Sequence, residues 1–302
     1  MFKNQSGQVR AGWLILLTFV VMLIVQQLFS LPGILLLMFT EAPLSEGFSY
    51  LDMQTAFDTH PWIYLLMQGG GTAGGIVITL LLWRFINKGS MKEIGLRGSF
   101  KDLWFGLFLG ALSIIVIFIL LMATANVTLL NSLANPRFSV FTLTFLLLFI
   151  LVGFFEELFF RGYVMSTLAS RGNKKWVIYV ASAIIFSIAH GANPNVSLLG
   201  LVNIALVGLL FAYMFDATKS LWLPIGYHIT WNYFQGNVFG FAVSGTAPNG
   251  IYTVEIAEGH DWLTGGSFGL EGGILATMLI LIGFIATKLY SKSKNLQNTG
   301  NL

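Results

Sequence analysis

The sequence lacks cysteine and has few charged residues. None of its 302 residues is a cysteine, which excludes disulfide bonds, thiolate catalysis and cysteine-ligated zinc. Charged residues make up only 10% of the chain and hydrophobic residues 56%, whereas a soluble domain has about 25% charged residues. This composition predicts one integral membrane domain over residues 1–302. The net charge of +3 is spread over short loops, so we expect no nucleic-acid partner.

Long apolar stretches fill most of the chain. Each is close to the ~20 residues that a helix needs to cross the hydrocarbon core of a bilayer. The predicted fold class is therefore all-α, a polytopic membrane bundle of about eight transmembrane helices. The stretches lie at residues 11–39, 62–86, 103–125, 140–168, 176–191, 198–216, 220–240 and 270–289.

Positive and negative charges are segregated between the loops of this topology. All of the 16 basic residues except Arg137 and Arg161 lie at the termini or in the loops at 84–102, 169–175 and 217–219. The loops on the other side carry acidic residues instead: Glu41, Glu46, Asp52, Asp58, Glu255, Glu258, Asp261 and Glu271. Because cytoplasmic loops are enriched in Lys and Arg, we predict cytoplasmic termini and a multi-pass protein of the cell membrane.

Two adjacent carboxylates, Glu156 and Glu157, interrupt the fourth apolar stretch. One acidic side chain near the middle of a membrane helix costs roughly 2.5–3.5 kcal/mol, and such residues usually serve a reaction, a proton path or an ion site. Arg161 follows Glu157 by one helical turn, so these two side chains are expected to form an ion pair. Glu156 lies about 100° around the helix from Glu157, so the two carboxylates cannot do the same work.

Three other polar residues fall in the predicted spans: His190 is expected near the depth of Glu156, and His228, with Asn232 in the seventh span, somewhat nearer the cytoplasm. Glu156 and His190 are equally far along the chain from Asn173, the centre of the turn between spans four and five. Asn232 follows His228 by one helical turn, so both project from one helix face. A cluster of Glu156, His190, His228 and Asn232 inside the bundle is therefore feasible.

Such a cluster has the groups that activate a water molecule. A carboxylate in apolar surroundings can act as a general base, and a neighbouring histidine can orient the water or accept its proton. A His–Asn pair can stabilise an oxyanion. Glu156, His190 and His228 could instead bind a divalent metal such as zinc, with water at an open position. Both routes lead to hydrolysis, and the sequence leaves both open.

These residues fall in three motifs that resemble the CPBP family of intramembrane endopeptidases, also called the CAAX-protease, bacteriocin-processing or Abi family. The motifs lie in order in separate spans and define a motif-bearing catalytic core at 140–240. They are Glu156-Glu157-x-x-x-Arg161, Phe186-x-x-x-His190 and His228-x-x-x-Asn232.

The resemblance implies hydrolysis of a peptide bond within the membrane. By this resemblance, Glu156 and His190 activate the water, and His228 and Asn232 stabilise the oxyanion. The expected partners are the lipid bilayer and a peptide or membrane-protein substrate that is membrane-associated or enters the membrane. The signatures of other intramembrane proteases, such as His-Glu-x-x-His and Gly-x-Gly-Asp, are absent from the sequence.

The same resemblance gives Glu157 and Arg161 a supporting role beside the catalytic residues. Two other functions remain as alternatives. One is a proton-coupled transporter or ion pathway that uses Glu156 and His190 as relay groups. The other is a non-catalytic immunity protein, which would have the same fold and would sequester a peptide such as a bacteriocin.

Overall fold

The computed structural model describes residues 2–4, 7–41 and 59–299. Its helices and π-helical segments are α1 (Ala11–Glu41), α3 (Pro61–Tyr64), η1 (Leu65–Gly69), α4 (Gly70–Phe85), α5 (Phe100–Ala123), α6 (Val140–Glu157), η2 (Leu158–Met165), α7 (Ser166–Ser170), α8 (Lys175–Ala189), α9 (Leu198–Thr218), α10 (Trp222–Tyr233), η3 (Phe234–Val238), α11 (Asp261–Thr264) and α12 (Ile274–Thr299). Two short 3-10 turns, η4 (Gly266–Phe268) and η5 (Leu270–Gly272), and two strands, β1 (Val127–Leu129) and β2 (Val254–Ile256), complete the described elements. The predicted outward acidic residues Glu46, Asp52 and Asp58 lie outside the described residues.

The predicted all-α membrane bundle is confirmed. In the described part of the chain, 6 helices are long and apolar enough to cross a membrane. The fifth and seventh predicted spans correspond to shorter helices, α8 and α10, and α10 continues directly into η3. The protein is therefore a multi-pass integral membrane protein, while the count of eight spans and the cytoplasmic termini stay predictions.

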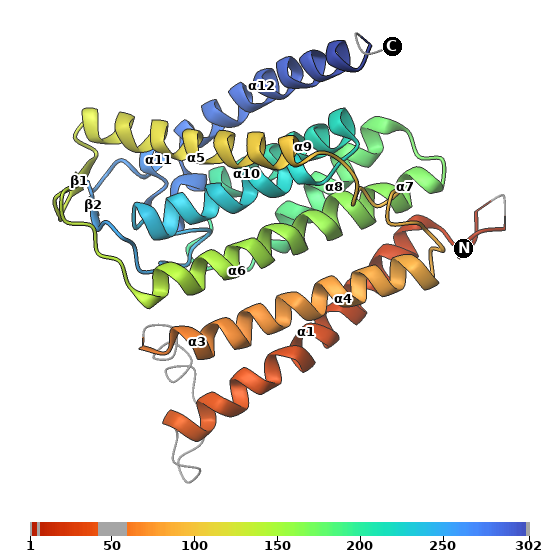
Figure 1. Cartoon of the computed structure of the whole chain (residues 1–302), viewed down its shortest axis with the longest axis horizontal. Helices are drawn as coiled ribbons and strands as arrows, with labels where there is room; N and C mark the ends of the chain where they lie inside the picture. The colour runs from red at the N-terminus through yellow and green to blue at the C-terminus, as the bar shows by residue number, and fades with distance from the viewer. Residues whose placement is uncertain (1, 5–6, 42–58, 300–302) are drawn as a thin grey trace.

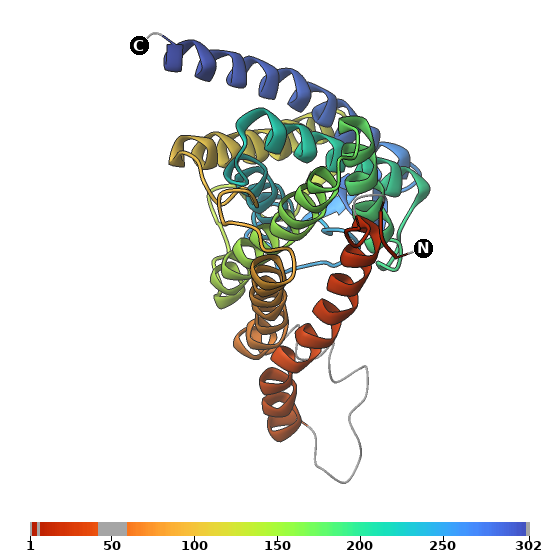
Figure 2. The same cartoon turned by 90° about the vertical axis from the view of Figure 1, so that its right-hand side faces the viewer.

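The helices form a main bundle with a hairpin beside it (Figures 1 and 2). Helices α1 and α4 pack against each other on one side of the bundle, and α12 lies on the opposite side. A buried hydrogen-bond chain ties the hairpin to the bundle. Thr18 of α1 donates to the Tyr163 hydroxyl at 2.6 Å, and that hydroxyl donates to Asn87 after α4 at 3.0 Å.

Glycines allow α5 and α10 to pack at close range. A Cβ atom on Gly106 of α5 would lie 2.2 Å from the carbonyl oxygen of Leu223, and one on Gly110 would lie 2.3 Å from that of Tyr227. A Cβ atom on Gly226 of α10 would likewise lie 2.4 Å from the carbonyl oxygen of Leu103. Small residues let membrane helices approach until their backbones touch. This contact fixes the position of α10, which carries the third motif.

The glycine-rich segment between η3 and α12, residues 239–273, folds back over one end of the bundle. Strands β1 and β2 pair antiparallel, with Thr128 opposite Glu255. The buried Asn203 side chain of α9 donates to the backbone oxygens of Glu271 at 2.8 Å and Gly273 at 2.9 Å. These two hydrogen bonds from α9 thus hold the segment against the bundle.

A buried ion pair joins α5 to the last helix. Asp102 is fully buried, and the Lys294 ammonium donates to both of its carboxylate oxygens at 2.8 Å. The Tyr290 hydroxyl donates to one of them, also at 2.8 Å. Removing one partner of such a pair leaves the other charge without compensation.

We therefore expect Asp102→Asn to lower the free energy of unfolding by about 1–3 kcal/mol, because Lys294 loses its counter-charge. Thermal unfolding in detergent measures the effect. Lys101→Ala, at an exposed position on the same helical turn, is the control and should change little. Equal stability of the two variants would contradict the account of this end of the bundle.

Candidate active site

The two motif helices α6 and α10 meet at a glycine. A Cβ atom on Gly153 of α6 would lie 2.8 Å from the Ile229 side chain of α10, so glycine lets the helices approach at this level. Both helices then change to π-helical geometry at their motifs: η2 begins directly after Glu157 and contains Arg161, and η3 begins shortly after Asn232. Single π-helical turns are frequent at functional sites because they redirect side chains locally.

A fully buried ion pair, Glu157–Arg161, lies next to the candidate site. Arg161 donates to Glu157 Oε1 at 2.8 Å, and both side chains have no exposure to solvent. This is the ion pair that the spacing predicts. The guanidinium carbon lies 4.2 Å from the centroid of the Phe186 ring and 5.1 Å from that of Phe211. Aromatic faces stabilise a cation electrostatically, so Arg161 is held between a carboxylate and two rings.

The two motif histidines are oriented in the same way. His228 Nδ1 lies 3.0 Å from Glu157 Oε1, and His190 Nδ1 lies 2.8 Å from the backbone oxygen of Phe186. Carboxylate and carbonyl oxygens only accept hydrogen bonds, so each Nδ1 must carry a proton and donate it. In the neutral rings the free lone pair is therefore on Nε2, which is the atom that faces Glu156.

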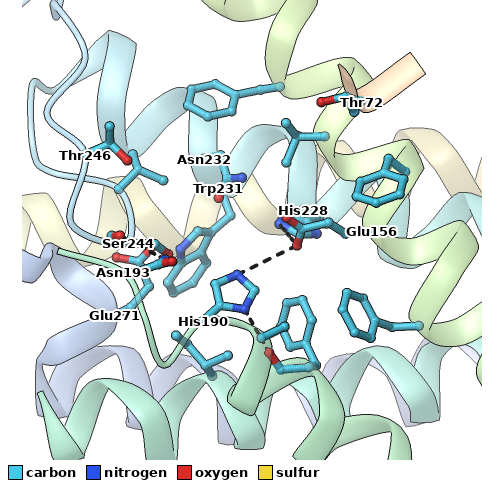
Figure 3. Close-up of a pocket in the computed structure, with 18 of the residues that line it drawn as sticks. Thr72, Glu156, His190, Asn193, His228, Trp231, Asn232, Ser244, Thr246 and Glu271 are labelled. Atoms are coloured by element: carbon cyan, nitrogen blue, oxygen red, sulfur yellow. Dashed lines mark hydrogen bonds and ion pairs between the residues drawn. The ribbon is translucent and has the colours of Figure 1, made fainter. Parts of the chain in front are cut away.

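Glu156 stands between these two rings (Figure 3). Its Oε2 atom lies 3.9 Å from His190 Nε2 and 3.8 Å from His228 Nε2. It is buried and has no hydrogen-bond partner among the described residues. These separations exceed a direct hydrogen bond but suit a bridging water. The structure thus brings together three of the four residues that the sequence placed in one cluster.

The fourth residue, Asn232, lines the same cavity, with Glu156 and both histidines. Its side chain has no hydrogen-bond partner within the parts of the chain that the structure describes. The cavity has a volume of about 400 Å³, within the usual range for small-molecule and peptide side-chain sites. Met22 of α1 and Thr72 of α4 also line the cavity.

The cavity also contains polar residues that sequence reasoning missed. Glu271, counted above as an outward loop residue, is only 8% exposed and lines the cavity together with Asn193 and Ser244. Burial raises the pKa of Glu271 to about 7. It precedes an apolar stretch with no motif spacing around it, so no pattern in the sequence marks it. Only the return of the glycine-rich segment over the bundle brings it to the site.

The metal site that the sequence left open gains no support from the side-chain arrangement. Among the described residues, no group of three His, Asp or Glu side chains is placed to hold a metal ion. This includes the expected set of Glu156, His190 and His228.

Comparison with known proteins supports the class of protein that this site suggests. Residues 137–234 match the family model described as Rce1-like, "Type II CAAX prenyl endopeptidase Rce1-like". The match spans α6 to α10 and contains all three motifs. It confirms the predicted resemblance to the CPBP or CAAX-protease family and supports a CAAX-type intramembrane protease. No curated protein and no solved structure gives a significant match.

The buried Glu157–Arg161 ion pair leads to a stability prediction. Arg161→Met should lower the free energy of unfolding by about 3–5 kcal/mol, because Glu157 would remain buried without its counter-charge. Adding Glu157→Gln to this variant should restore a large part of the loss, since no unpaired charge then remains. Denaturation of the wild type, both single variants and the double variant measures the coupling. If the losses of unfolding free energy in the two single variants simply add up in the double variant, the ion pair does not contribute to stability.

Proposed function

We propose that the protein is an intramembrane endopeptidase in which Glu156 and His190 activate a water molecule. The observation that carries this proposal is the unpartnered Glu156 Oε2 atom, buried between two imidazole Nε2 atoms at 3.8 and 3.9 Å. A water in this gap can donate one hydrogen to the carboxylate and the other to His190. It then has a lone pair free for attack on a carbonyl carbon.

The reaction uses the two carboxylates differently. As the water oxygen bonds to the peptide carbonyl carbon, Glu156 takes its proton and later gives that proton to the leaving amide nitrogen, so that the C–N bond breaks. The Asn232 side chain donates to the oxyanion. His228 can donate beside it from Nε2 only as an imidazolium ring, because its Nδ1 proton is donated to Glu157.

The proposed substrate is a peptide that is associated with the membrane or enters it. Helix α1 forms one wall of the cavity through Phe19 and Met22, and exposes Leu17, Ile24 and Leu28 on its other face. A single apolar helix thus separates the cavity from the lipid on that side. The family model that matches residues 137–234 is that of CAAX prenyl endopeptidases, which act on peptides, and a peptide with an apolar anchor fits this wall.

Peptide profiling of membranes tests the proposal. Cells with wild-type protein and cells with Glu156→Gln at equal expression are compared by mass spectrometry of membrane and secreted peptides. We expect products that are present with the wild type and absent with the variant, because a general base contributes about 10²–10⁴-fold to rate. Identical profiles from two folded proteins would contradict a protease and favour the immunity alternative.

The oxyanion role of Asn232 gives a separate prediction. Asn232→Ala should lower kcat by about 10²–10³-fold with little change in KM, because its amide acts on charge that develops in the transition state. Once a cleaved peptide is known, steady-state kinetics in liposomes measure both constants. His260→Ala, at an exposed position of the glycine-rich segment, is the control and should retain full activity. A change in KM alone would show that Asn232 only binds substrate.

A further inference from the structure

A second carboxylate, Glu271, reaches the cavity from the glycine-rich segment. In Figure 3, Glu271, Ser244 and Asn193 lie on one side of His190, and Glu156 lies on the other. All five line the same cavity. The water-activation chemistry uses Glu156 and His190 and leaves Glu271 without a role.

Glu271 has only neutral partners. Its Oε2 accepts a hydrogen bond from the Gln235 amide, and its Oε1 accepts one from the Ser244 hydroxyl at 3.3 Å. Both oxygens therefore have donors, but the negative charge has no counter-charge. Every other fully or nearly buried carboxylate of the described chain outside the cavity has one: Asp102 pairs with Lys294 and Glu157 with Arg161.

The other cavity residues that can carry a positive charge are His190 and His228, and their ion-pair contacts are with Glu156 and Glu157 rather than with Glu271. The cavity lining, within the described residues, includes two carboxylates, Glu156 and Glu271, and no Lys or Arg. The raised pKa of Glu271, to about 7, agrees with burial that no positive charge offsets. A cation that enters the cavity would therefore be bound by charge and would restore the ionised carboxylate.

The apolar walls of the cavity suit a long cationic side chain. Trp231, Ala276 and Ile280 line the cavity together with Glu271 and are nearly or fully buried. Apolar surface of this kind accommodates the methylene stem of Lys or Arg while the charged end reaches an acceptor. The Trp231 ring adds a face that attracts a cation.

We propose that Glu271 is a specificity-determining residue that binds a Lys or Arg side chain of the peptide substrate. The inference deepens the proposed protease function and rests on it. Asn193 and Ser244 border this subsite, and Asn193 is itself fixed by a 3.1 Å hydrogen bond from its amide to the backbone oxygen of Ser244. Cleavage then occurs at a set distance along the peptide from a basic residue.

Cleavage-site profiling tests the subsite. The full chain, reconstituted in liposomes, is incubated with a synthetic library of acyl-anchored peptides, and the products are sequenced by mass spectrometry. For the wild type we expect Lys and Arg to be enriched at one position relative to the scissile bond. Glu271→Gln keeps the side-chain shape and one acceptor oxygen but removes the charge, so the enrichment should fall by about tenfold to a hundredfold.

Two further variants separate specificity from folding. Glu258→Gln removes an exposed carboxylate of the same segment and should leave the cleavage profile unchanged. Glu271→Lys reverses the charge and should favour Asp or Glu at the same position. A loss of all cleavage in Glu271→Gln, for neutral and basic peptides alike, would indicate a structural residue and overturn the subsite.

A binding measurement distinguishes this inference from the protease proposal. The Glu156→Gln variant, with and without Glu271→Gln, is titrated with a fluorescent acyl-anchored peptide containing Lys and with its norleucine counterpart. Tighter binding of the Lys peptide that disappears with Glu271→Gln supports the subsite whatever the catalytic result. Wild-type cleavage with no basic preference would overturn the subsite alone, and absence of cleavage and of selective binding would overturn both proposals.

Discussion

The ion pair between Glu157 and Arg161 is the interaction on which the candidate site depends. It lies with no solvent exposure between motif helices, where an unpaired charge would be strongly unfavourable. Arg161 is packed against the Phe186 and Phe211 rings, and Glu157 in turn orients the ring of His228 through Nδ1. One buried pair thus links helices α6, α8, α9 and α10 and sets the direction of a histidine in the cavity.

This arrangement explains why two adjacent glutamates are present in a membrane helix. Glu157 is held by Arg161 and His228 and cannot approach a substrate. Glu156, one residue earlier, lines the cavity, where its Oε2 atom faces the Nε2 atoms of His190 and His228. The first carboxylate faces the cavity, whereas the second pairs with the buried Arg161 guanidinium. The cost of each acidic residue in the bilayer is offset in a different way.

Much of the fold and part of the site could be predicted from the sequence. The apolar stretches gave the positions of the long helices because their length and composition are local properties. Spacing within one helix predicted the Glu157–Arg161 pair, and equal depth across a hairpin made the approach of Glu156 and His190 feasible. The position of Glu271 could not be predicted, because it depends on how a long glycine-rich segment folds back and on hydrogen bonds from Asn203.

The division of work between Glu156 and Glu157 is the central claim, and one paired measurement tests it. Thermal unfolding midpoint and peptide cleavage rate are measured together for Glu156→Gln and Glu157→Gln. The account predicts that Glu156→Gln keeps the wild-type midpoint but loses about 10²-fold or more in rate, whereas Glu157→Gln unfolds at a markedly lower temperature. A stable and active Glu157→Gln variant, or a Glu156→Gln variant that loses stability instead of activity, would contradict it.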